Sequence, residues 1–310
     1  MKQSLEWKSN WIKIKEWFSA KTESKTRKPN YKVRYIVQRS ITYILLTFAA
    51  LLVFMPFYWM VLTALKSDYA VEIRPPQLFT LKLHFENFLR AWQATRFDLY
   101  FRNTLIVAFF STLGTVVTST LAAFAFARLE FKGRDVLFLI LLGTMMVPGE
   151  MLIITNFITV KSLNWDDTFF ALIVPFMTSV FYIFFLRQTF KQIPNELYLA
   201  AKVDGTSDFK YLLKVMIPIA KPTLTTIIIL SAIGSWNAYV WPSLVTSLSN
   251  DARKMISNGL RDSAFVDDLG RIRYNLQMAG STIVTLPLLI VFLTLKKYII
   301  RGVSRSGIKG

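Results

Sequence analysis

Long uncharged runs, separated by short polar connections, dominate the chain. Five runs of 19 to 29 residues contain no Asp, Glu, Lys or Arg, and a sixth is interrupted once, by Glu150. Because a bilayer core of about 30 Å needs roughly 20 apolar helical residues, each run is long enough to cross a membrane. The pattern predicts an all-α polytopic membrane protein with six transmembrane helices near residues 40–65, 103–127, 136–160, 168–186, 222–245 and 276–297.

The charge distribution gives these spans an orientation. The chain is 53% hydrophobic and carries a net charge of +18, which by itself would also suit a nucleic-acid-binding protein. Alternate connections, however, hold 25 of the 37 Lys and Arg residues, and the opposite set holds only 12. Because basic residues mark cytoplasmic loops, both termini are predicted to be cytoplasmic and no nucleic acid is needed to explain the charge. The basic connections are residues 1–39, 128–135, 187–221 and 296–310.

The two ends of the chain form separate segments in this scheme. Residues 1–39 are expected to be a cytoplasmic basic arm, residues 40–300 a transmembrane domain and residues 301–310 a cytoplasmic tail. The first apolar run is too long for a cleavable signal peptide, so we expect it to be retained. Aromatic and apolar residues recur with helical spacing in the arm, as in an interfacial amphipathic helix, but a disordered basic tail fits equally well.

Most catalytic and metal chemistry is excluded by composition. The chain has no Cys and a single His, His84, which removes thiolate zinc sites, catalytic thiols and imidazole metal clusters. It also lacks the Gly-x-x-x-x-Gly-Lys-Ser/Thr loop that cradles nucleotide phosphates. We therefore expect no enzyme activity, no catalytic residue and no bound metal or cofactor in this chain.

The long basic connection has its own helical pattern. Pro194 precedes a helix-forming stretch that Asn195 can cap, and Glu196 stands in the first turn, where the helix dipole favours a negative charge. Gly205 can end this helix in a left-handed conformation. A second helix is expected to begin at a cap formed by Asp208 and to end at the prolines that follow. The loop should therefore form a compact helix–Gly–helix elbow.

This loop resembles that of the membrane subunits of ATP-binding cassette importers, which carry Glu-Ala-Ala, three residues, Gly, and about nine residues later Ile-x-Leu-Pro. The matching residues here are Leu199-Ala200-Ala201, Gly205 and Val215-Met216-Ile217-Pro218. The family's glutamate falls on Leu199, since Glu196 occupies a separate upstream position, which puts in doubt any contact that this carboxylate makes.

Further matches extend the resemblance over most of the chain, and they are similar to the carbohydrate branch of the family, in particular to the smaller maltose-type permease subunit. They lie in the expected order along the chain: Phe57-Tyr58-Trp59-Met60, Leu65-Lys66-Ser67, Pro75-Pro76, Phe85-Glu86-Asn87-Phe88, Asn103-Thr104-Leu105, residues 122–129, Met146-Val147-Pro148, Trp236-Asn237 and the basic tail from Arg301.

The resemblance implies a type I importer transmembrane fold and a permease subunit of an ATP-driven sugar or oligosaccharide importer. It implies a second permease subunit, an ATPase dimer that binds ATP and Mg, an extracytoplasmic sugar-binding protein and a bacterial-type cytoplasmic membrane with its lipid. The loop 194–218 would couple to the ATPase. The residues expected to do so are Glu196, Leu199, Ala200, Ala201, Lys202, Asp204, Gly205 and Pro218.

Candidates for a substrate path are fewer. Glu150 follows Pro148-Gly149 inside a span, where a charge is expensive and usually functional, although it could instead reach the interface or pair with another helix. Aromatic and amide side chains bind sugars, but membrane interfaces also collect aromatic residues, and the partner subunit could hold the substrate alone. The candidates are Glu150, Asn156, Trp236, Asn237 and Tyr239.

Three alternatives stay open at this point. An importer for another solute, such as glycerol phosphate, would have the same architecture. An ion-coupled secondary transporter would need more intramembrane carboxylates than Glu150 and recognisable repeats. A membrane enzyme would need acidic or histidine clusters, and the only adjacent acid pairs, Asp166-Asp167 and Asp267-Asp268, have no histidine near them in the sequence. Co-purification with an ATPase would separate these classes.

The charge pattern makes a direct prediction of topology. Cysteines introduced at Ser24, Ser207 and Ser306 should resist an impermeant thiol reagent added outside intact cells, because their segments lie on the basic side. A cysteine at Ser263 should react. Labelling of Ser207→Cys from outside would contradict the six-span arrangement.

Overall fold

The structure is a computed structural model that describes residues 15–17, 31–247, 251–263, 265–267 and 269–304. Most of the basic arm and the last six residues therefore lie outside the described residues. In the described part the regular elements are helices, and the one pairing of extended segments is an isolated bridge between Val266 and Ile272. The chain divides into two units, residues 1–59 and 60–310.

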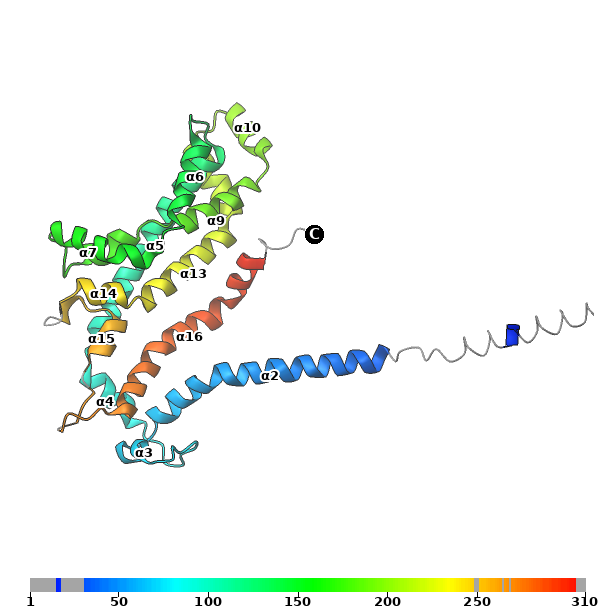
Figure 1. Ribbon diagram of the computed structural model, residues 1–310. Coiled ribbons are helices and arrows are strands. Elements are labelled where there is room, and N and C mark those ends of the chain that lie inside the picture. Colours follow the sequence, from blue (N-terminus) through cyan, green and yellow to red (C-terminus); the bar gives the residue numbers. More distant parts are fainter. Residues whose placement is uncertain (1–14, 18–30, 248–250, 264, 268, 305–310) are drawn as a thin grey trace, which may run out of the picture. The chain divides into compact units, whose positions relative to one another are not determined.

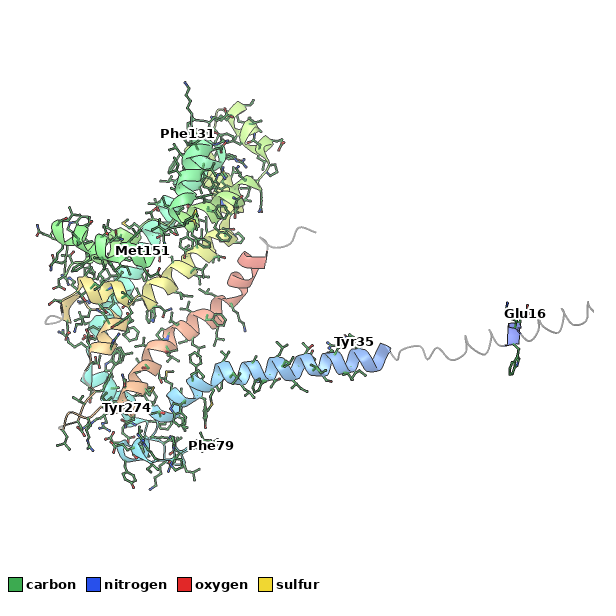
Figure 2. All side chains as sticks on the ribbon, viewed as in Figure 1. Glu16, Tyr35, Phe79, Phe131, Met151 and Tyr274 are labelled. Carbon is green, nitrogen blue, oxygen red and sulfur yellow. The ribbon has the colours of Figure 1, made fainter. Side chains whose placement is uncertain are left out.

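The first unit is built on one long helix. Helix α2 (Tyr31–Ala64) starts in this unit, and its last residues belong to the second. The described side chains from Tyr35 to Phe57 are exposed and project on every side of the helix (Figure 2). A helix that is apolar all round suits a membrane rather than water.

The helices that follow α2 along the chain belong to the second unit (Figure 1). They are α3 (Asp68–Glu72), α4 (Glu86–Ala94), α5 (Phe97–Arg128), α6 (Arg134–Thr144), η1 (Gly149–Leu152), α7 (Ile153–Ser162), α8 (Phe169–Ile173), η2 (Val174–Phe176), α9 (Val180–Lys191), α10 (Asn195–Val203), α11 (Asp208–Tyr211), η3 (Leu212–Met216), α12 (Ile217–Ile219), α13 (Lys221–Asn237), α14 (Val240–Val245), η4 (Asp251–Arg253), α15 (Ile256–Asp262) and α16 (Tyr274–Ser304).

Helix α5 is the centre of this unit. It packs against α9 and α13 along much of its length, and α16 packs against α13 and α4 (Figure 1). The end of α5 around Phe124 belongs to a core that includes Phe190 of α9 and Ile227 of α13. Its beginning, around Phe97, belongs to another core with Trp236 and Ile256. One helix therefore links two separate apolar cores.

Four helical segments of the described chain are long and apolar enough to cross a membrane, and two bent pairs raise the number to six if each pair is one span. The third expected span consists of α6 and the η1–α7 pair, which meet at 84°. The fifth is shorter than expected, because α13 ends at Asn237, where Ala238 turns to an extended conformation, and α14 follows as a separate helix. Membrane crossing by the bent pairs stays a prediction.

The fourth expected span is broken near its middle, and side chains of α5 form hydrogen bonds with the carbonyl groups at the break. Helices α8, η2 and α9 are interrupted around Pro175 and Thr178. Hydroxyl groups of Thr115 and Thr118 donate to the carbonyl oxygens of Phe176 and Met177, each at 2.7 Å. These bonds satisfy carbonyl groups that the break leaves without helical partners.

The close approach at this break makes a stability prediction. A Cβ atom added at Gly114 would lie 2.6 Å from Met177 Cγ and Cε, whereas one added at Gly143 would meet no atom within 4 Å. Overpacking costs about 1–3 kcal/mol. Gly114→Val should therefore lower the thermal midpoint of the detergent-solubilised protein, and Gly143→Val should not. Equal midpoints would contradict the close packing of α5 against this segment.

Candidate functional site

The helix–Gly–helix elbow is present between α9 and α13. Helix α10 begins directly after Pro194, so the cap residue is Pro194 and not Asn195, which lies inside the helix. Proline supplies no side-chain acceptor, and the first turn instead contains Glu196, whose negative charge suits the positive end of the helix dipole. The predicted helix is therefore present with a shifted cap.

Gly205 ends α10 in the left-handed conformation that the sequence predicts. Its φ is +71°, its amide donates to the carbonyl of Lys202 at 3.0 Å, and the amide of Thr206 donates to the carbonyl of Ala201 at 2.8 Å. This pair of bonds is a Schellman motif, which satisfies the last carbonyl groups of the helix. A Cβ atom at this position would meet no other atom, so the demand for glycine comes from the backbone alone.

The second helix of the elbow differs from the prediction at its N-terminal cap. Its cap is Ser207, which has an extended backbone and whose hydroxyl accepts from the amide of Lys210, while Asp208 is the first residue inside the helix. The helix ends at Ile219, between Pro218 and Pro222, as the sequence predicts. Since Pro218 has no N–H to donate, the ordinary turn cannot close there, and the π-helical turn η3 (Leu212–Met216) precedes it.

Asp208 joins the two helices of the elbow. Its Oδ1 accepts a hydrogen bond from the Tyr198 hydroxyl at 2.8 Å and forms an ion pair with the ammonium group of Lys202 at 3.4 Å. Burial, and then this hydrogen bond, raise the pKa of Tyr198 above its usual value. The Tyr198 ring contacts the rings of Phe124 on α5 and Tyr211 on α11. The inner side of α10 is therefore packed on the membrane helices.

Two buried arginines fasten the base of the elbow. Arg128, at the end of α5 and 8% exposed, donates from its guanidinium to the carbonyls of Phe190 and Ile193, where α9 gives way to the elbow. Arg187 donates to the carbonyl of Phe126 at 3.1 Å and pairs with Asp135 at 3.4 Å. The sequence analysis did not identify either residue as an anchor, because it used arginines at the ends of the spans only to decide which side of the membrane is cytoplasmic.

The outer side of the elbow exposes apolar side chains. Leu199 is 55% exposed and Val203, one turn later, is 88% exposed, while Phe209 of α11 is 61% exposed. Leu199 is thus presented on the surface and not used in the core. The other residues expected to couple to the ATPase are also exposed, apart from half-buried Ala201: Glu196, Ala200, Lys202, Asp204, Gly205 and Pro218.

The structure separates the residues expected on the substrate path. Glu150 is exposed in η1 at the bend before α7, and Asn156 is exposed on α7. Trp236 is buried in a core against Phe101, with ring centroids 5.6 Å apart. The other two residues follow it closely: Asn237 ends α13, and Tyr239 lies beneath the guanidinium of Arg261.

No group of three or more His, Asp or Glu side chains in the described part of the chain is placed to hold a metal ion. The described elbow offers hydrogen-bonding and apolar groups instead. Such a surface is suited to protein contact.

Known proteins resemble this chain closely. The family of binding-protein-dependent transport system inner membrane components matches residues 114–305. The trehalose/maltose transport system permease protein MalG of Thermococcus litoralis is 32% identical over 84% of this chain and 93% of its own length. The sn-glycerol-3-phosphate transport system permease protein UgpE of Yersinia pestis is 28% identical over 85% and 95%. The sequence resemblance is thereby confirmed.

A solved structure supports the fold as well. A bacterial ABC transporter involved in the import of the acidic polysaccharide alginate contains a chain that matches with a TM-score of 0.76 and 24% identity, covering 84% of this chain and 96% of that one. This confirms the importer transmembrane fold.

The Arg128 anchor generates a prediction for the elbow. Hydrogen bonds from a charged donor contribute about 1.5–3 kcal/mol, which corresponds to roughly tenfold to hundredfold in local opening. Arg128→Gln should therefore accelerate amide hydrogen exchange in α10 at least tenfold in the purified complex. Arg134→Gln, which removes a pair with exposed Asp135, is the control. Unchanged exchange in Arg128→Gln would show that the anchor does not hold the elbow.

Proposed function

The chain belongs to the family of binding-protein-dependent transport system inner membrane components, and we propose that it is the transmembrane permease subunit of an ATP-driven sugar or oligosaccharide importer that couples to its ATPase through the elbow. The observation that carries this proposal is the two-sided character of α10. Tyr198 on its inner side is buried against α5, while Leu199 and Val203 on its outer side are exposed. Such an element is fitted to transmit movement from a partner protein to the membrane helices.

ATP and Mg would be bound by the partner ATPase, since this chain has no phosphate-binding loop. Helix α10 would lie in a groove of that ATPase, as amphipathic helices do in other partners. Closure of an ATPase dimer would displace the elbow. Because Arg128 and Tyr198 connect the elbow to α5, the displacement would shift the helices between inward-open and outward-open states.

Leu199 defines the character of this contact. The resemblance places a glutamate of the family at this position, where the chain has an exposed leucine beside Val203. The charged neighbour Lys202 carries the opposite charge to the family's carboxylate, and its ammonium group forms an ion pair with Asp208 at 3.4 Å. The ATPase groove would therefore meet an apolar ridge, with Asp204 and Lys210 as polar neighbours. Exposed apolar patches of this kind mark protein contacts.

The substrate assignment rests on similarity to the trehalose/maltose permease. A second permease subunit would complete the pore, and a sugar-binding protein would dock on the outer connections, particularly 251–273. Lys254 keeps the described part of that connection in place, with ion pairs of 3.0 Å to Asp251 and 3.1 Å to Asp262. Burial by itself lowers the pKa of Lys254, but these carboxylates outweigh burial and hold the pKa above its usual value.

The membrane would be a bacterial-type cytoplasmic membrane, with both termini inside and lipid around the apolar helices. Glycerol phosphate is the second candidate substrate, because the chain is also similar to a permease for it. An ion-coupled transporter would not need the elbow. Purification of the chain together with an ATPase subunit therefore distinguishes an ATP-driven importer from an ion-coupled transporter. The absence of an ATPase from every complex purified with this chain would contradict the proposal.

Gly205 tests the coupling role directly. The left-handed φ of +71° costs an ordinary residue roughly 1 kcal/mol, and more for Val, whereas Asn tolerates it. Gly205→Val should distort the turn, so that the complex reaches the membrane but loses at least tenfold in transport or in ATPase association. Gly205→Asn should retain most activity. Wild-type transport and ATPase association in Gly205→Val would make the elbow a passive connector.

A further inference from the structure

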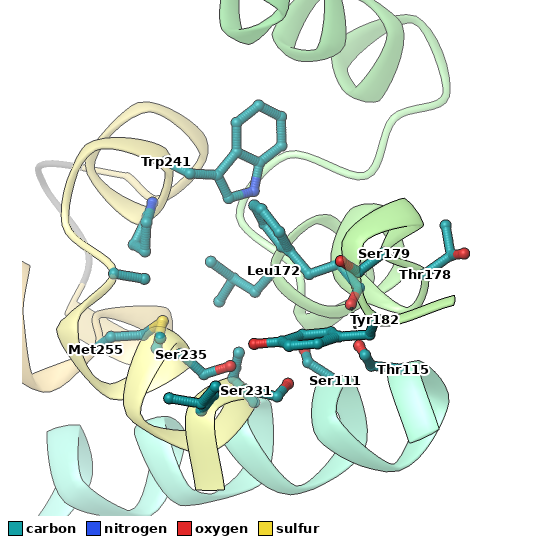
Figure 3. Close-up of a pocket in the computed structure, with 16 residues that line it drawn as sticks. Ser111, Thr115, Leu172, Thr178, Ser179, Tyr182, Ser231, Ser235, Trp241 and Met255 are labelled. Atoms are coloured by element: carbon teal, nitrogen blue, oxygen red, sulfur yellow. Dashed lines mark hydrogen bonds between the residues drawn. The ribbon is translucent and has the colours of Figure 1, made fainter. Parts of the chain in front are cut away.

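A pocket of about 290 Å³ lies among the helices of the second unit, away from the elbow. Its walls come from α5, the broken α8–η2–α9 segment, α13 and α14, with Met255 closing one side (Figure 3). None of the five residues expected on a substrate path lines it. Trp241, which is buried and belongs to α14, does.

The lining has a specific chemical composition. Hydroxyl groups of Ser and Thr project from three walls, and Figure 3 shows the Tyr182 ring extending across the pocket toward Ser231 and Ser235. Every lining residue is uncharged. The lining residues that carry hydroxyls are Ser111, Thr115, Thr178, Ser179, Tyr182, Ser231 and Ser235.

One of these hydroxyls is buried without a partner. Ser111 is 1% exposed, and its Oγ makes no hydrogen bond in the structure. A buried polar group left unsatisfied costs about 1–3 kcal/mol, and such groups are uncommon in folded proteins. Among the residues that line the pocket, Ser111 is the one with such a hydroxyl.

The break in the fourth span supplies further polar groups. Ser179 stands at the cap position of α9, yet its side chain makes no capping bond. The Trp241 indole is fixed, because its Nε1 donates to the carbonyl of Ala171 at 2.9 Å. Its ring also meets Phe176 edge to face, with centroids 6.0 Å apart. Rigid aromatic rings and convergent hydroxyls therefore share one cavity.

We propose that this pocket is a binding subsite for one or two rings of a neutral sugar, contributed by this subunit itself. Sugar hydroxyls both donate and accept hydrogen bonds, as the serine and threonine hydroxyls do, and aromatic side chains cover the apolar faces of sugar rings. The volume stands at the small end of the range of about 300–1,000 Å³ for ligand pockets. The inference rests on the proposed function and sharpens its substrate class.

The same lining excludes a charged substrate. A phosphate or carboxylate in this pocket would find no cation in the lining to pair with it. Burial of an unpaired charge is far more costly than burial of a hydroxyl. The pocket therefore favours the neutral sugar over glycerol phosphate as the transported solute.

The buried serines of α5 give a matched test. Ser111 and Ser119 are both buried on this helix with no hydrogen-bond partner, but only Ser111 lines the pocket. If the pocket binds sugar, Ser111→Ala should lower the amount of sugar imported per ATP hydrolysed at least fivefold, and Ser119→Ala should leave it within twofold. Both changes remove an unsatisfied hydroxyl, so neither should lower the thermal midpoint.

A second variant fills the pocket. A Cβ atom at Gly234, which lines the pocket on α13, would meet no atom within 4 Å, so Gly234→Leu adds bulk to the cavity without a clash at Cβ. It should lower uptake at least tenfold while ATPase activity stimulated by the loaded binding protein stays within twofold. That ATPase activity reports assembly and coupling independently of the pocket.

The experiment measures import by the complete transporter in proteoliposomes. The probes are radiolabelled maltose, trehalose, arabinotriose and sn-glycerol 3-phosphate. Import of a neutral sugar that Ser111→Ala and Gly234→Leu impair supports the inference. Wild-type import in both variants, or efficient import of sn-glycerol 3-phosphate, overturns it and leaves the permease assignment intact. Failure of the chain to associate with any ATPase would overturn the proposed function instead.

Discussion

Broken helices inside a membrane create carbonyl groups that water cannot reach, and α5 supplies the groups that satisfy them. Thr115 and Thr118 donate to the two carbonyls at the break before α9, and Arg128 donates to the two carbonyls after it. At the break before α9, buried carbonyls left unpaired would cost several kcal/mol per group in a lipid environment. After α9, Arg128 adds a charged donor at the base of the elbow, where Phe190 O also accepts from the amide of Ile193. The pocket and the elbow both depend on this arrangement, since each is formed at an end of α9.

The fixed position of α9 has a mechanical consequence. The segment is bound to α5 at both ends, so a force applied to the elbow reaches α5 and α9 together and is not absorbed by a flexible joint. Because the α5–α9–α13 core extends into the elbow through Tyr198 and Tyr211, the joint contains few places to bend. The bend of 84° between α6 and the η1–α7 pair lies outside this core and is the candidate hinge instead. Movement would then concentrate where the chain already changes direction.

Sequence patterns predicted the helices and the left-handed turn, because both depend on local properties. Apolar run length gives α2 and α5, and a glycine before a polar residue gives the turn at Gly205. The patterns failed where the decisive partner is distant in sequence. Arg128 was missed as an anchor because the carbonyls that it binds, those of Phe190 and Ile193, lie 62 and 65 residues further along the chain. The pocket was missed for the same reason, since its hydroxyls come from helices more than 100 residues apart and serine in an apolar run carries no individual signal.

Serine and threonine hydroxyls cost little free energy inside a membrane when they are hydrogen-bonded, and they occur in this chain in two settings. Some bond to a carbonyl of their own helix, as Thr104 and Thr226 do, which satisfies the hydroxyl without a partner from another helix. Hydroxyls left without such a bond must find another partner or remain a cost. On α5 these residues cluster on the face that meets α9 and α13, where Thr112 donates to Ser231 and Ser111 has no partner. A hydroxyl-lined face without charges can hydrogen-bond a polar, uncharged solute but offers an ion no opposite charge, and selectivity against ions then follows from what the pocket lacks.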